Sequence, residues 1–176
     1  QSIWGPARRK VKKDTIELNK LFKSDGYSGK LKPWDWRYYA EKKREKKFKF
    51  NEDDVKSYFQ LDNLIDAISY SCNRLFNLKL KKVGMSAYHE DCKVFEVLKH
   101  NKRIGLFIGD YYAREGKRSG AWCSTFRNQS KVNGKRLNPI VLNVCNFSKP
   151  QKGMPCLLTF DEAKTLFHEF GHALHQ

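Results

Sequence analysis

The chain has 176 residues, of which 40% are hydrophobic, 14% aromatic and 31% charged, a composition that can bury a core and excludes wholesale disorder. Lysine and arginine number 35 against 19 acidic residues, a net charge of +16, and charges interrupt every apolar stretch before it reaches the length of a transmembrane helix. The N-terminus lacks the apolar middle region of a secretory signal peptide, so we expect no membrane association.

The positive charge suggests nucleic acid as a binding partner, because clustered cations release counterions from phosphates. The cations form runs at residues 8–13 and 41–49, but acidic residues interrupt the second run and no nucleic-acid-binding motif accompanies either. We therefore expect solvated helix faces and no nucleic-acid partner. A basic nucleic-acid-binding module stays open as an alternative.

The five cysteines are a second compositional signal. They are scattered, odd in number, and form no C-x-x-C pair. This pattern predicts free thiols, mostly small buried apolar groups, in a reducing compartment. We accordingly expect a cytoplasmic protein, and a monomer.

The first part of the chain, residues 1–92, is predicted to be a helical segment. Residues 6–23 carry an apolar stripe at spacings of three and four, glycines and a proline mark a loop, and residues 34–47 predict a second helix. Asn51 can cap a third helix. A fourth helix begins at residues 60–62 and has the cleanest stripe of the chain, made of Leu61, Leu64, Ile65, Ile68, Cys72, Leu75 and Phe76.

The pattern changes to that of strands in the segment 93–150. Two β-branched and aromatic runs within residues 93–112 surround a short polar turn, which predicts a hairpin. Two further strand-like runs, 121–126 and 139–147, flank the dipeptide Asn133-Gly134, which suits a type I′ turn. We therefore expect a small, mostly antiparallel sheet that starts near residue 93.

The last segment, residues 151–176, returns to a helical pattern. Thr159 and Glu162 form the T-x-x-E pattern of a capping box, which predicts the start of the helix. The side of this helix that is buried is expected to consist of Ala163, Leu166, Phe167, Phe170 and Leu174.

This last helix carries the motif H-E-x-x-H, formed by His168, Glu169 and His172. Residues four apart lie on one face of a helix, so both imidazoles can bind the same zinc ion. Zinc lowers the pKa of bound water from about 15.7 towards roughly 7, and a neighbouring carboxylate can accept the proton as the water attacks a carbonyl. We therefore predict His168 and His172 as zinc ligands and Glu169 as the catalytic base.

Other interpretations of the motif are a chance match, a pair of core histidines, or a helix with ordinary ion pairs. The cap upstream and the apolar stripe favour the zinc site. His175 follows His172 by three residues, where the longer H-E-x-x-H-x-x-G-x-x-H motif has glycine, so it is not assigned as a ligand. Glycine at position 171 makes the helix less stable by roughly 1 kcal/mol than alanine would. We expect Gly171 to permit close approach of another backbone.

Several sequence blocks, in order along the chain, are more specific than the pentapeptide. They are PWDWRYYAEK (33–42), LDN…NRL (61–75), GAW (120–122), NVCNF (143–147) and LFHEFGHALH (166–175). Together they resemble the thimet-oligopeptidase-like zinc metallopeptidases, in particular their bacterial peptidyl-dipeptidase (dipeptidyl carboxypeptidase) branch. The resemblance covers essentially the whole chain.

The resemblance implies an α+β part of a mostly helical, zincin-like metallopeptidase with two lobes and a closed cleft, in which the sheet segment lines the cleft. It implies one Zn²⁺ per full-length chain, with a third ligand from a glutamate on a later helix, and tyrosine and histidine residues that stabilise the oxyanion. None of these later residues falls within the 176 residues. We therefore expect a truncated part of a catalytic region that is inactive by itself.

The function implied by the resemblance is a zinc peptidyl-dipeptidase, which releases C-terminal dipeptides from short peptide substrates. An endo-acting oligopeptidase of the same family is the alternative, and an inactive fragment is an alternative of another class. In the family the GAW strand lines the cleft beside the zinc helix. A strand there can pair with an extended peptide, so we assign Gly120 and Ala121 to substrate binding.

Overall fold

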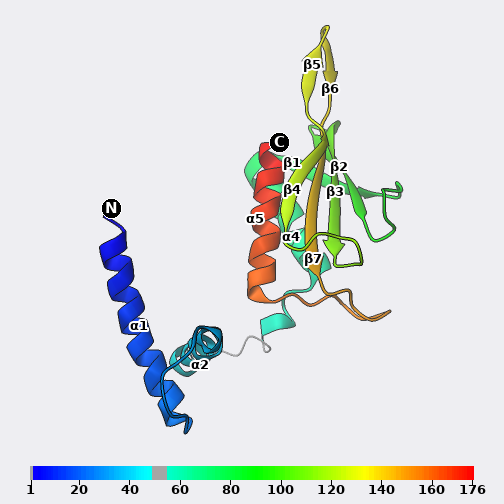
Figure 1. Cartoon of the computed structure of the whole chain (residues 1–176). Coiled ribbons are helices and arrows are strands. Elements are labelled where there is room, and N and C mark those ends of the chain that lie inside the picture. Colours follow the sequence, from blue (N-terminus) through cyan, green and yellow to red (C-terminus); the bar gives the residue numbers. More distant parts are fainter. Residues whose placement is uncertain (1, 49–54) are drawn as a thin grey trace. The chain divides into compact units, whose positions relative to one another are not determined.

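The computed structural model describes residues 2–48 and 55–176, which fall into two compact units, one within residues 1–54 and one within residues 55–176 (Figure 1). The predicted third helix, capped by Asn51, lies outside the described residues at its start. None of the helices in the described ranges combines the length and the apolar character that crossing a bilayer requires.

The N-terminal unit is a pair of helices, α1 (Trp4–Ser24) and α2 (Trp36–Phe48), with the short 3-10 helix η1 (Pro33–Asp35) before α2. The rings of Phe22 on α1 and Tyr39 on α2 meet edge to face, with their centroids 5.5 Å apart. Both predicted helices are therefore confirmed, and the second half of the α1 stripe forms their contact.

In the C-terminal unit, the helices α4 and α5 accompany a five-stranded sheet and a separate two-stranded hairpin (Figure 1). The sheet order is β1-β2-β3-β7-β4, and β5 pairs with β6. The α+β class predicted from the sequence is confirmed. The bounds are α4 (Leu61–Phe76), β1 (Leu78–Val83), β2 (Lys93–Lys99), β3 (Lys102–Tyr112), β4 (Trp122–Arg127), β5 (Ser130–Val132), β6 (Lys135–Leu137), β7 (Ile140–Phe147) and α5 (Phe160–His175).

The sheet is mixed, because β7 runs parallel to β3 while the other three pairings are antiparallel. After β3 the chain forms β4 and the β5–β6 hairpin before it returns as β7 between β3 and β4. The predicted β2–β3 hairpin is confirmed. At Asn133 and Gly134 the φ angles are 50° and 76°, both positive as a type I′ turn requires.

The sheet begins earlier than the sequence analysis predicted. α4 ends at Phe76, and the left-handed backbone of its C-cap, Asn77 (φ 55°), turns the chain directly into β1. β1 then pairs with β2 along its whole length, so the predicted boundary near residue 93 is wrong. Leu78 and Leu80 alternate with exposed lysines and pack against the core, which is the period of a half-buried strand.

The main core lies between one face of the sheet and the two helices. Successive residues of a strand point to opposite faces, so the apolar run of β7 contributes both to this core and to a smaller cluster on the other face. All five cysteines are unpaired and three of them are buried, as predicted. The main core includes Leu61, Ile65, Ile68, Cys72, Phe107, Tyr111, Val141, Cys145, Phe147, Leu166 and Phe170.

Candidate active site

α5 begins where the sequence predicted. Thr159 is its N-cap: the hydroxyl oxygen accepts a hydrogen bond from the backbone N–H of Glu162 at 3.2 Å. The carboxylate of Glu162 accepts one from the backbone N–H of Thr159 at 2.8 Å. This reciprocal capping box stabilises the first turn, and so determines which residues of the following turns face the sheet.

The face of α5 that packs on β7 and β4 differs in part from the predicted stripe. Phe170 is buried, and its ring meets that of Phe107 edge to face with centroids 5.1 Å apart. Phe167 and Leu174 are 41% and 39% exposed, so the described residues cover them only in part. The sheet-facing side also includes Glu169, because α5 lies over two strands of one sheet edge.

His168 and His172 lie one turn apart on the exposed side of α5. Their Nε2 atoms are 3.1 Å apart and their ring centroids 4.7 Å apart. Two nitrogen ligands of a tetrahedral zinc ion, each about 2.0–2.1 Å from the metal, lie roughly 3.3 Å apart. The pair therefore fits as two ligands of one ion. Across residues 2–48 and 55–176, no group of three or more His, Cys, Asp or Glu side chains is placed to hold a metal.

Gly171 lies between the two histidines in the sequence. Apart from its chain neighbours and the backbone of its own helix, a Cβ atom built at this position would meet no atom of the described residues within 4 Å. The close backbone approach that we expected at Gly171 is therefore wrong within this part of the chain.

Glu169 is buried between α5 and the sheet, with only 8% of its surface exposed. Burial raises the pKa of the Cys123 and Cys145 thiols, and the nearby Glu169 carboxylate raises both further, that of Cys145 to about 12. No side-chain hydrogen bond reaches the Glu169 carboxylate from the residues that the structure describes. The influence of Glu169 on the two pKa values shows that both thiols lie near the carboxylate, and thiols are weak hydrogen-bond donors.

Asn143 on β7 is a second buried polar group on this face of the sheet. It has no exposed surface, and neither atom of its amide has a hydrogen-bond partner within the described ranges. It lies opposite Cys123 in the β4–β7 ladder and two residues before Cys145, so all three side chains share one face. An unpaired buried amide costs roughly 1–3 kcal/mol, so the space beneath α5 is more polar than stability alone favours.

An open depression lies over the first half of α5, beside the start of β4. The structure thus brings Ala121 together with His168 and Glu169. Gly120, the residue before Ala121, has a φ of 93°, a conformation that favours glycine, and forms the entry to β4. The residues that line the depression are Ala121, Asp161, Lys164, Thr165, His168 and Glu169.

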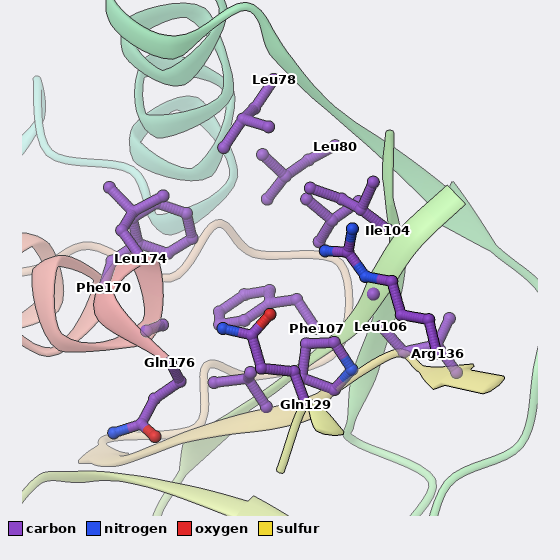
Figure 2. A pocket seen from close by; sticks show the side chains of 15 residues that line it. Leu78, Leu80, Ile104, Leu106, Phe107, Gln129, Arg136, Phe170, Leu174 and Gln176 are labelled. Carbon is purple, nitrogen blue, oxygen red and sulfur yellow. The ribbon is translucent and has the colours of Figure 1, made fainter. Parts of the chain in front are cut away.

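A second pocket lies under the C-terminal end of α5 and is mostly apolar. Figure 2 shows Phe170 and Leu174 of α5, with Leu78 and Leu80 of β1 beside them, among the side chains that line it. Its lining contains no carboxylate and no imidazole. It therefore lacks the groups that metal-assisted hydrolysis needs, and we assign no chemistry to it.

Comparison with known proteins identifies the family. The chain matches the profile of Peptidase family M3 over residues 5–176. The chain belongs to peptidase family M3. It is 37% identical to the dipeptidyl carboxypeptidase of Escherichia coli (strain K12), 34% to the oligopeptidase A of the same organism, and 32% to the thimet-like oligopeptidase of Dictyostelium discoideum. Each alignment covers 96% of this chain but only 25%, 25% and 26% of the relative, so the chain spans about a quarter of the length of these curated relatives.

The membership in family M3 confirms the resemblance that the sequence blocks indicated, and with it the prediction of a peptidase family. Relatives named dipeptidyl carboxypeptidase and relatives named oligopeptidase A match at similar identity. The comparison therefore leaves the two modes of cleavage that the sequence analysis considered, dipeptide release and internal cleavage, both open.

The sequence analysis of this M3 chain missed Asp110 on β3, which is 1% exposed. Its carboxylate accepts hydrogen bonds from both terminal nitrogens of Arg114, at 2.7 and 2.9 Å, and from Nζ of Lys117, at 2.9 Å. The hydroxyl of Tyr88 donates to it at 2.6 Å. The sequence does contain a signal for this buried cluster: an acidic residue inside the apolar run 103–112. A buried strand tolerates a carboxylate only when the carboxylate is paired.

We expect Asp110 to make the stability of this M3 chain sensitive to acid. Burial alone raises the pKa of the carboxyl, but the hydrogen bonds from Arg114, Tyr88 and Lys117 outweigh burial and lower it from 3.8 to about 2. The contribution to stability is thus complete above about pH 4 and is lost as the pH falls through about 2; the shift corresponds to about 2 kcal/mol.

Urea unfolding at about pH 5 and about pH 2.5 measures this contribution. The wild-type chain is expected to lose more free energy of unfolding between these two values than Asp110→Asn does. Equal losses in the two proteins would show that another group causes the acid sensitivity.

Proposed function

We propose that this chain supplies the beginning of the catalytic region of a zinc-dependent metallopeptidase. The observation that carries the proposal is the 3.1 Å approach of the Nε2 atoms of His168 and His172, next to the buried carboxylate of Glu169, in a chain of family M3. When bound, zinc polarises the scissile carbonyl and acidifies the attacking water.

The residues of this chain have separate roles in the proposed reaction. His168 and His172 bind the metal as neutral imidazoles, one nitrogen each. Glu169 is not a ligand: its carboxylate accepts the proton of the attacking water and then donates it to the leaving amine. The weak donors around Glu169 support this role, because no strong hydrogen bond from the described residues competes for its oxygens. Catalytic zinc sites use three protein ligands, and the family resemblance implies a glutamate on a later helix as the third.

The proposed substrates are short peptides that bind in extended form along β4. This strand is the last of the sheet, and among the described residues it pairs only with β7, so its outer edge carries unpaired backbone groups. An extended peptide can add to such an edge, which brings its backbone to Ala121 and hence to the depression shared with His168 and Glu169. Gly120 contributes the turn that places Ala121 there.

We further propose that the enzyme is a cytoplasmic monomer that releases C-terminal dipeptides. The identity of 37% to a dipeptidyl carboxypeptidase and the PWDWRYYAEK block support this mode of cleavage. An oligopeptidase that cuts internal bonds is the second candidate, because oligopeptidase A matches at 34% identity.

The test uses the natural protein that contains this chain and an N-blocked tetrapeptide with a free C-terminus. We expect release of the C-terminal dipeptide, loss of turnover with a chelator, and recovery with zinc. Amidation of the C-terminus is expected to lower kcat/KM at least about a hundredfold, because a site that binds a carboxylate rejects an analogue without one. Equal cleavage of both peptides would favour the oligopeptidase, and no metal-dependent hydrolysis of either would contradict the proposed function.

A further inference from the structure

The loop between β3 and β4, residues 113–121, leads directly into the candidate active site. The ladder between β4 and β7 begins at the pair Trp122 and Val144, so the ladder leaves the residues before Trp122 unpaired. Ala121, which lines the depression with His168 and Glu169, is among these unpaired residues. Its position therefore depends on what holds the loop.

The middle of the loop is held by the side chain of Lys117. Its Nζ donates to the backbone carbonyls of Asp110, at 3.1 Å, and Tyr112, at 2.7 Å, in addition to the Asp110 carboxylate. Only 5% of the Lys117 side chain is exposed. The loop is thus fixed to the end of β3 by a buried ammonium group with three protein acceptors, the full number that it can serve.

The last part of the loop is held by Asn146 on β7. Its Nδ2 donates to the carbonyl of Arg118 at 2.8 Å and to that of Gly120 at 2.7 Å. A side-chain amide nitrogen has two N–H groups, and both are used here. These two hydrogen bonds take the place of the backbone hydrogen bonds that β7 would otherwise make with this segment. The backbone before β4 is therefore held to β7 as far as Gly120.

We propose that Asn146 is a positioning residue for peptide binding: its amide fixes the backbone of residues 118–120, and so presets Ala121 and the outer edge of β4 to receive an extended peptide. This inference rests on the proposed function. Without the amide, residues 118–121 sample many conformations, and a peptide must order them when it binds. The loss therefore falls on the affinity for substrate and not on the chemical step at Glu169.

The test compares Asn146→Asp, Asn146→Ala and a matched control, Asn138→Asp. Asn138 also donates its amide to a backbone carbonyl, that of Arg103 at 3.0 Å, but the carbonyl belongs to the β2–β3 end of the sheet. Asn146→Asp keeps the shape and removes both donors, and Asn146→Ala removes them without adding a charge. Kinetics with the N-blocked tetrapeptide and amide hydrogen exchange of the loop are measured in the natural protein.

Both variants of Asn146 are expected to raise KM about tenfold and to change kcat less than about threefold. Amides of residues 117–124 are expected to exchange faster than in Asn138→Asp, while β2 and β3 keep their protection. A general loss of folded enzyme would instead lower kcat at an unchanged KM. An unchanged KM in both variants, or unchanged loop exchange, overturns the inference although the wild-type enzyme is active. An inactive wild-type enzyme overturns the proposed function, and the inference with it.

Discussion

Replacement of Glu169 by glutamine is expected to lower kcat by a factor of roughly 10²–10⁴, the contribution of a positioned general base, while zinc stays bound at about one ion per chain. Glutamine has nearly the shape of glutamate but cannot accept the proton of the attacking water. Glu169 is 8% exposed, and the hydrogen bond of His168 and His172 is with each other, so the change leaves the proposed ligands in place. Peptide hydrolysis and metal analysis of the same preparation measure the two effects.

The control for this experiment is Asp66→Asn, the same change of charge at an exposed carboxylate of α4. It is expected to keep kcat within about threefold of the wild-type value. His168→Ala, in contrast, is expected to lose both zinc and turnover. Loss of zinc from Glu169→Gln would show that the carboxylate is a ligand, and retained turnover would show that another group is the base.

Replacement of Asp110 by asparagine is expected to lower the free energy of unfolding by about 3–5 kcal/mol, the cost of removing one partner from a buried ion pair. The Lys117 side chain is 5% exposed and the Arg114 side chain 24% exposed, so two positive charges lose their counter-charge where water reaches them poorly. Urea unfolding of the chain at neutral pH measures this loss.

A matched control is Glu96→Gln on the neighbouring strand β2. Glu96 accepts a hydrogen bond from Arg103 across the β2–β3 hairpin at 3.3 Å, but the Arg103 side chain is 56% exposed. Solvent screens such a pair, so we expect Glu96→Gln to lower the free energy of unfolding by less than about 1 kcal/mol. Similar losses in the two variants would mean that burial does not strengthen the Asp110 cluster.

Local sequence patterns predicted α1, α2, α4, α5, the β2–β3 hairpin and the motif, because these depend on neighbours along the chain. The spacing of His168 and His172 places their rings on one helix face whatever surrounds the helix, and the structure brings their Nε2 atoms to 3.1 Å. Thr159 and Glu162 are three residues apart, so the start of α5 could be predicted in the same way. The dipeptide at residues 133–134 determined its own turn, since few residues adopt two consecutive positive φ angles.

The neighbours of β4, the proposed substrate-binding strand, followed only from the tertiary structure. The order β1-β2-β3-β7-β4, with β7 parallel to β3, depends on pairings between distant segments. The alternation of apolar and polar residues in a strand indicates which residues are buried, but it does not indicate which strand lies beside it. Ala121 reaches the motif residues because of that order. The amide of Asn146 looks like an ordinary polar interruption in an apolar run, and the carboxylate of Asp110 indicates that it is paired but not with which groups. Arg118 and Gly120 become partners of Asn146, and Arg114 and Lys117 become partners of Asp110, only when the loop folds. Tyr88, the other partner of Asp110, comes from the segment between β1 and β2.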